Sequence, residues 1–148
     1  MEFLDTNVFL RYIVQPDPGE VHLVRQAGRA RAIFQGMAQG GRTATTCEGV
    51  IVEIVQVLSS RALYNVPRAD IQRLLSPLLR LPALKLAHKR AYFRALDLYV
   101  EQPRLDFVDC LNVAHMERQG IGRILSFDRD FDRVAGIERH EGGADEGQ

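Results

Sequence analysis

The chain has 148 residues, 46% of them hydrophobic and 26% charged, a composition typical of a globular domain with a sizeable core. Its apolar runs are too short and too often interrupted by charge to span a membrane, which excludes a transmembrane protein. The first residues, MEFLDTNVFL, show no basic region followed by a cleavage site, so we expect a cytoplasmic protein.

The order of patterns along the chain predicts strands that alternate with helices. Residues 2–5 are typical of a buried strand, and residues 6–14 of a helix that ends at QPDPGE. A second helix, at 21–39, is expected to stop at the glycine pair that follows it. The remaining strands are expected at 42–46, 81–87, 123–128 and 136–139, and the remaining helices at 47–60, from Pro67 in a first turn with Asp70, and at 88–102, 106–120 and 129–136.

This alternation predicts an α/β domain whose parallel sheet is covered by helices on both faces. We expect one domain over residues 1–138 and a flexible tail at 139–148. Ligands of such sheets bind beyond the carboxyl ends of the strands. Asp5 and Asp128 each end a predicted strand, so both are expected at the same rim.

Each acid near these strand ends also has an ordinary structural explanation. Asp5 can cap the helix that follows it, and Asp128 can cap the short helix at 129–136. Asp106 can cap the helix at 106–120, where Asp109 would complement the helix dipole. Taken singly, each carboxylate is explained at least as well by structure as by function.

Glu53 is harder to explain by structure alone. On a helical wheel it lies about 60° from Val50 and about 40° from Val57, beside an apolar stripe. Val52 and Val55 occupy the far side, so we expect this helix to be buried nearly all round. A buried carboxylate without a partner is costly, and no Lys or Arg lies three or four residues away. Glu53 is therefore expected to need a cation from elsewhere.

Four carboxylates gathered at one rim would repel one another and raise their own pKa values unless a cation joined them. An oxygen-only set suits Mg²⁺ or Mn²⁺ rather than Zn²⁺. Such an ion activates water and neutralises charge on phosphate oxygens, so hydrolysis of phosphodiester bonds is the expected chemistry.

A thiolate or imidazole metal site is not expected. Cys47 and Cys110 lie far apart, and the four histidines have no partner at zinc-ligand spacing. We expect both cysteines to be buried thiols without a chemical role.

Charge is distributed unevenly, although the 19 basic and 19 acidic residues cancel. Residues 21–47 hold four arginines and no acid, and residues 71–96 hold six basic residues and no acid. A basic rim beside an acidic focus would suit a phosphodiester substrate. The alternative is that these segments are the solvated faces of helices.

Four stretches together resemble the PIN domain family, namely DTNVFL, EIVQVL, DFVDCLNVAH and LSFDRDF. The resemblance covers about residues 1–138 in the family's order, and the subtype is the VapC-like toxin ribonucleases of bacterial toxin–antitoxin pairs. It implies a three-layer α/β/α fold and Mg²⁺- or Mn²⁺-dependent endoribonuclease activity. It also implies an RNA substrate, a homodimer and a small VapB-like antitoxin as partner.

The resemblance assigns roles residue by residue. The family's catalytic, metal-binding acids correspond to Asp5, Glu53, Asp109 and Asp128. Its supporting polar positions correspond to Thr6, Asn7, Ser126 and Asp130. Ser126 replaces a frequent Thr and keeps the hydroxyl. Asp106 matches a less regular acidic position, so we expect it to cap its helix.

Two other families that begin with a strand and an Asp do not fit. A haloacid-dehalogenase-type phosphatase needs a second Asp at position 7, where the chain has Asn7. A phospho-receiver domain needs paired acids at the end of its first strand, where Asp5 stands alone. A PIN nuclease of RNA maturation and a non-catalytic PIN-like module that binds RNA or protein both stay open, although the filled acidic positions argue against the second.

Overall fold

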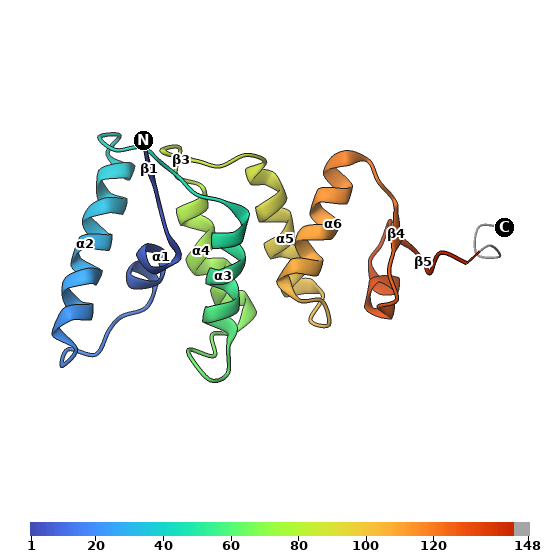
Figure 1. The fold of residues 1–148 in the computed structure, drawn as a ribbon, viewed down its shortest axis with the longest axis horizontal. Helices are drawn as coiled ribbons and strands as arrows, with labels where there is room; N and C mark the ends of the chain where they lie inside the picture. The colour runs from blue at the N-terminus through green and yellow to red at the C-terminus, as the bar shows by residue number, and fades with distance from the viewer. Residues whose placement is uncertain (144–148) are drawn as a thin grey trace. The chain divides into compact units, whose positions relative to one another are not determined.

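The structure is a computed structural model that describes residues 1–143. The chain forms two compact units, Met1–Lys89 and a second that begins at Arg90, and each is described by itself (Figure 1). Part of the expected tail, 144–148, lies outside the described residues. The first two tail residues, 139 and 140, belong instead to the last strand. The single domain over 1–138 stays a prediction.

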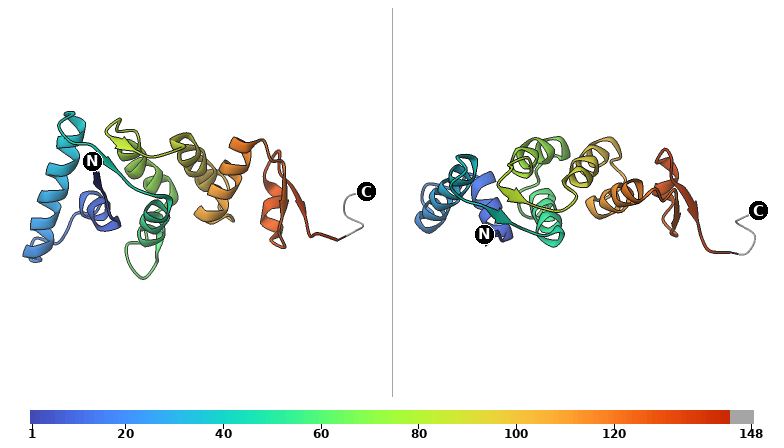
Figure 2. Two further views of the ribbon diagram at one scale, coloured as in Figure 1. Left: turned by 45° about the horizontal axis from the view of Figure 1, so that its top comes forward. Right: turned by 90° about the horizontal axis from the view of Figure 1, so that it is seen from above.

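The first unit is a three-stranded parallel sheet with its helices. Its elements are β1 (Glu2–Phe3), α1 (Thr6–Ile13), α2 (Val21–Ala38), β2 (Ala44–Thr45), α3 (Glu48–Ser59), α4 (Arg68–Leu79) and β3 (Leu84–Lys85). The strand order is β1-β2-β3, with Glu2 opposite Ala44 and Ala44 opposite Leu84 (Figure 2). Parallel neighbours need a crossover between them, and the helices provide it.

Aromatic packing fixes α1 within this unit. Phe9 is fully buried and its ring lies 5.4 Å from that of Phe34 in α2, while Tyr12 lies 4.8 Å from the same ring. The other side of α1 packs against α3, which in turn packs against α4. The N-terminal end of α1, which carries the first candidate residues, is thereby held on a rigid support.

The prediction that α3 is buried nearly all round is wrong. Its buried face is formed by Val50, Ile51, Ile54, Val55 and Leu58. Glu53 lies about 160° from Ile51 on the helical wheel, and its side chain is exposed. The expectation took Val50 and Val57 as the centre of the buried face, whereas Ile51 and Leu58 form that centre. Burial therefore gives no reason for a cation at Glu53.

The second unit contains α5 (Lys89–Glu101) apart from its first residue, and also α6 (Phe107–Gln119), β4 (Arg123–Leu125), the 3-10 helix η1 (Arg129–Arg133) and β5 (Glu138–His140). Two hydrogen bonds, 2.9 and 3.2 Å long, join Arg94 in α5 to Glu117 in α6. Gly120 ends α6 in the left-handed conformation, at φ 72°, as its glycine predicts. Strands β4 and β5 pair in parallel.

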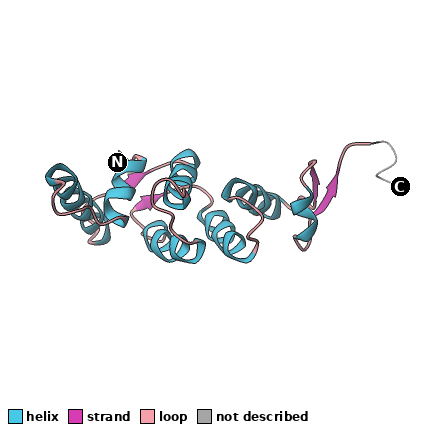
Figure 3. Cartoon of the chain, turned by 90° about the horizontal axis from the view of Figure 1, so that it is seen from below, coloured by secondary structure: helices cyan, strands magenta, loops and turns pink. Residues whose placement is uncertain are grey.

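The predicted α/β class is confirmed. Every strand pair in residues 1–143 is parallel, and helices connect strands that are only two or three residues long (Figure 3). Pro67 is the N-cap of α4 rather than a first-turn residue. Cys110 is buried as expected, but Cys47 is exposed, because it precedes α3 at the surface. No helix among the described residues has the length and hydropathy needed to cross a bilayer.

Candidate active site

Asp5 joins β1 to α1. It occupies the N-cap position with extended backbone (φ −84°, ψ 164°), yet its side chain makes no capping hydrogen bond. The residue is also exposed. Capping therefore does not account for this carboxylate, which is free to bind a ligand.

The backbone immediately before Asp5 is firmly held. The Leu4 N–H donates to the carbonyl oxygen of Thr45 at 2.9 Å, and the buried Thr46 hydroxyl donates to the carbonyl oxygen of Leu4, also at 2.9 Å. These bonds tie the carboxyl ends of β1 and β2 together. Sequence reasoning missed Thr46, and the only signal was a hydroxyl immediately after a predicted strand. Thr6 is buried at the start of α1.

Asn7 is exposed and lines a hollow of about 270 Å³ between α1 and α2. Arg11 and Arg29 also line it, and the Arg11 Nε donates to Gln26 Oε1 at 3.0 Å. The arginines of α2 at 25, 29 and 31 are exposed. Arg25 and Arg29 lie about 40° apart on the helical wheel and form a solvated face of α2, whereas Arg31 lies about 160° from Arg29. Part of that face borders the hollow that begins two residues after Asp5.

At the start of α6, Asp106 caps the helix as predicted. Its Oδ1 accepts a hydrogen bond from the Asp109 N–H at 2.8 Å, and the Asp109 Oδ2 accepts one from the Asp106 N–H at 3.4 Å. This reciprocal pair is a capping box in which Asp109 takes the place of the usual Glu or Gln. The two carboxylates are therefore held beside each other.

Desolvation by partial burial raises the pKa of Asp109 to about 6, and the negative charges of Asp106 and Asp128 add to the rise. A carboxylate with this pKa is destabilised in its charged form. Nearby positive charge would relieve it, and raised pKa values of this kind are a feature of functional sites. The influence of Asp128 also means that Asp109 and Asp128 lie close enough to interact.

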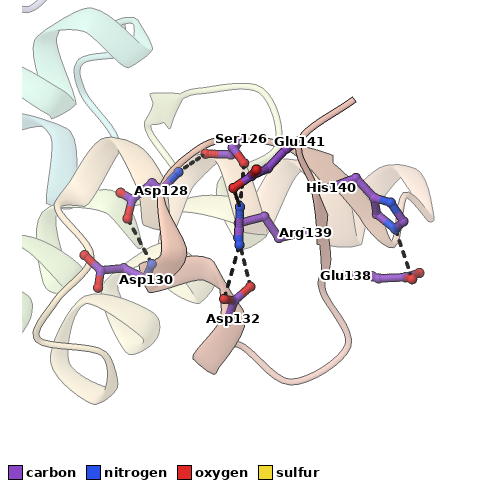
Figure 4. Close-up of polar contacts among 8 residues, drawn as sticks. All are labelled: Ser126, Asp128, Asp130, Asp132, Glu138, Arg139, His140 and Glu141. Carbon is purple, nitrogen blue, oxygen red and sulfur yellow. Dashed lines mark hydrogen bonds and ion pairs between the residues drawn. The ribbon is translucent and has the colours of Figure 1, made fainter. Parts of the chain in front are cut away.

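Asp128 lies in the turn between β4 and η1 (Figure 4). Its N–H donates to the Ser126 hydroxyl at 3.0 Å, and its Oδ1 accepts a hydrogen bond from the Asp130 N–H at 2.9 Å. Asp128 therefore caps η1, as its structural explanation predicted, and Ser126 supports its backbone. Asp130 is half-buried.

The structure distributes the predicted acids over both units. Asp5 and Glu53 belong to the first unit, on α1 and α3, two helices that pack together. Asp109 and Asp128 interact within the second unit. Across residues 1–143, no three acidic, histidine or cysteine side chains are grouped closely enough to hold a metal ion. A single rim that carries all four acids stays a prediction.

The donor groups in each unit fit a hard divalent cation. All four predicted ligands are carboxylates, Asp5 is exposed without a capping role, and Asp109 carries an unfavourable negative charge. Oxygen donors of this kind suit Mg²⁺ or Mn²⁺. A divalent cation bound at Asp109 and Asp128 would compensate the negative charge that helps to raise the pKa of Asp109.

The chain combines an α/β fold with carboxylates that follow parallel strands. Comparison with known protein families identifies the class of protein that shares these features. The PIN domain family model matches residues 3–137, and the chain belongs to this family. It is also similar to the VapC ribonuclease of Aquifex aeolicus (strain VF5). The two sequences are 27% identical over 134 residues, which cover 90% of this chain and 92% of that protein.

Proposed function

We propose that this PIN-domain protein is a Mg²⁺- or Mn²⁺-dependent endoribonuclease. Its family membership and its similarity to a VapC ribonuclease support nuclease activity on RNA. The observation that carries the proposal is the environment of Asp109, whose pKa is raised by partial burial and, to a smaller extent, by neighbouring carboxylates. A cluster that disfavours its own charge is suited to a cation.

The proposed site consists of Asp5, Glu53, Asp109 and Asp128 as the metal-binding acids. A bound metal ion would supply Lewis-acid stabilisation of the phosphate and a lowered pKa for attacking water. The protein's own contribution is to hold these carboxylates on rigid elements before the ion arrives, through the strand-end bonds at Asp5, the capping box at Asp109 and the turn at Asp128.

The arginines near Asp5 are suited to binding a polyanionic substrate. Arg11 and Arg29 line the hollow that begins at Asn7, and the exposed Arg25 lies about 40° from Arg29 on the same face of α2. Phosphate contacts from such residues position a nucleic acid without reading its sequence. We propose that RNA follows this basic face toward Asp5.

We further propose that the protein is the toxin of a VapBC-type pair, active in the cytoplasm as a homodimer and inhibited by a VapB-like antitoxin. The similarity to a VapC ribonuclease over nine-tenths of the chain supports this role. A neighbouring reading frame that encodes a small DNA-binding protein would favour it over a nuclease of RNA maturation. Absence of both RNA cleavage and metal binding would favour a non-catalytic binding module.

Removal of the metal tests the proposed chemistry. Purified protein is expected to cleave RNA in Mg²⁺ or Mn²⁺, to lose this activity in excess EDTA, and to regain it when Mn²⁺ is restored. Gel analysis of a 5′-labelled RNA measures each step, and internal cleavage distinguishes an endonuclease from an exonuclease. Full activity in EDTA would contradict the metal dependence.

Glu53→Gln separates function from folding. Because Glu53 is exposed on the side of α3 opposite the core, its amide is expected to leave the melting temperature unchanged within experimental error. Cleavage is expected to fall by about a hundredfold, since a proposed metal ligand is lost. The neighbouring exposed residue in the same helix, Gln56, offers a control as Gln56→Ala, for which both quantities should stay at the wild-type level. Wild-type cleavage by Glu53→Gln would remove this residue from the site.

A further inference from the structure

The Arg139 side chain, in β5, bridges the acidic loop, which we define as residues 126–132 (Figure 4). Its Nη1 donates to the carbonyl oxygen of Ser126 at 3.0 Å, at the first residue of the loop. Its Nε donates to Oδ1 of Asp132 at 2.9 Å, at the last residue. One guanidinium group therefore holds both ends of the acidic loop.

This arrangement depends on the shape of a guanidinium group. The Arg139 side chain is only 12% exposed, whereas those of Asp132 and Glu141 are 52% and 42% exposed. A cation at that depth needs several acceptors, and Arg139 has a third in Glu141, 2.8 Å from Nη1. A Lys ammonium is a single point donor and cannot reproduce the planar fork.

Asp128 lies inside the loop that Arg139 bridges. Its N–H is bound to the Ser126 hydroxyl, so the carbonyl that Arg139 holds and the hydroxyl that supports Asp128 belong to the same residue. Its Oδ1 accepts the Asp130 N–H, which orients the carboxylate. The next residue in the loop, Phe131, is buried and anchors the loop after Asp130.

The ion pairs of Arg139 do not involve the Asp128 carboxylate. Within residues 1–143, Arg139 pairs with Asp132 and Glu141 and not with Asp128. A cation that paired with Asp128 would compete with a metal ion for its oxygens. Arg139 instead neutralises the far end of the acidic loop and leaves the Asp128 carboxylate to another cation.

We infer that Arg139 is a positioning residue, which holds the acidic loop so that the Asp128 carboxylate is preset for a divalent cation. The role of that carboxylate rests on the proposed function, whereas the bridging of the loop does not. Sequence reasoning missed Arg139. Its available signal was the excess of acid at 128, 130 and 132, which calls for a cation on a neighbouring strand.

Amide hydrogen exchange tests the bridging directly. In Arg139→Gln, the amides of Asp128 and Asp130 are expected to exchange about tenfold faster or more, because the loop opens locally. Arg139→Lys should give an intermediate rate, since it keeps the charge and loses the fork. Arg133→Gln removes an exposed arginine of η1 and serves as the matched control, with wild-type exchange expected.

Mn²⁺ binding tests whether the bridge by Arg139 affects the affinity for a divalent cation. It is measured as the loss of the free-ion electron paramagnetic resonance signal. Arg139→Gln is expected to bind Mn²⁺ about 10- to 100-fold more weakly. Its kcat should fall at fixed Mn²⁺ and recover at high Mn²⁺, with the KM for RNA unchanged. If Arg139→Gln does not fold, Asp132→Ala removes the acceptor at one end of the loop and should weaken Mn²⁺ binding several-fold.

The two proposals fail in different ways. Wild-type exchange and wild-type Mn²⁺ affinity in a folded Arg139→Gln or Asp132→Ala protein would overturn the role of Arg139. If the unmodified protein bound no Mn²⁺ and cleaved no RNA, the proposed function would be overturned instead. Faster exchange at Asp128 in the variants would then still support the bridging of the loop.

Discussion

Asp5→Asn is expected to reduce RNA cleavage by at least about a hundredfold while leaving the protein as stable as before. Asp5 is exposed and its side chain makes no capping hydrogen bond, so the folded state loses no contact when the charge is removed. Loss of a proposed metal ligand, in contrast, weakens the cation site. Cleavage of a labelled RNA at saturating Mn²⁺ measures the first effect, and thermal unfolding without metal measures the second.

A matched control tests whether the effect is specific to position 5 or follows from any Asp→Asn change at the surface. Asp17→Asn makes the same change at another exposed acid of the first unit and should cleave RNA at the wild-type rate. Undiminished cleavage by Asp5→Asn would remove this residue from the site. A large fall in the melting temperature would mean instead that the charge of Asp5 stabilises the fold.

Asp109→Asn is expected to make the metal-free protein more stable at neutral pH and to reduce cleavage by at least about a hundredfold. Partial burial and the charges of Asp106 and Asp128 raise the pKa of Asp109 from 3.8 to about 6. The folded state therefore binds more protons than the unfolded state between these values, and wild-type stability falls as the pH rises through them. Above about pH 6 the charged carboxylate opposes folding.

The expected gain is small but measurable. Because Asp109 is only partly buried, solvent screening reduces the full effect to about 1 kcal/mol, or about 2–4 °C in melting temperature for a chain of this size. The amide that replaces the carboxylate keeps an oxygen that can accept the Asp106 N–H, so the capping box is retained. The gain should be present at about pH 8 and absent at about pH 4, where the wild-type carboxylate is protonated too.

Asp106→Asn provides the control for the second prediction. Asn caps a helix about as well as Asp, so the start of α6 should be retained. Removal of one negative charge should lower the pKa of Asp109, and Mn²⁺ binding should then persist to lower pH than in the wild type. A metal-free Asp109→Asn protein that is less stable than the wild type at about pH 8 would contradict the account of Asp109.

Local features of the candidate site followed from the sequence. Capping by Asp106 was predicted, capping by Asp128 was its structural interpretation, and both caps exist because their hydrogen bonds join residues two or three positions apart. Asp109, which was expected only to complement the helix dipole, also closes the capping box. The burial of α3 was predicted wrongly. Its apolar residues occupy more than half of the helical wheel, so periodicity alone did not show that the buried face is centred on Ile51 and Leu58, opposite Glu53.

By itself, the sequence determined the order of strands and helices, the parallel pairing that this order requires, and the placement of Asp5 and Asp128 after strands. Periodicity and backbone chemistry act over a few residues, which is why these features can be read from the chain. Only the tertiary structure decided that Asp5 does not cap α1, that Asp109 has a raised pKa, and that Arg139 bridges the acidic loop. Solvation, charge interactions and side-chain bridges depend on how the folded chain places side chains and solvent around each group, which periodicity does not show.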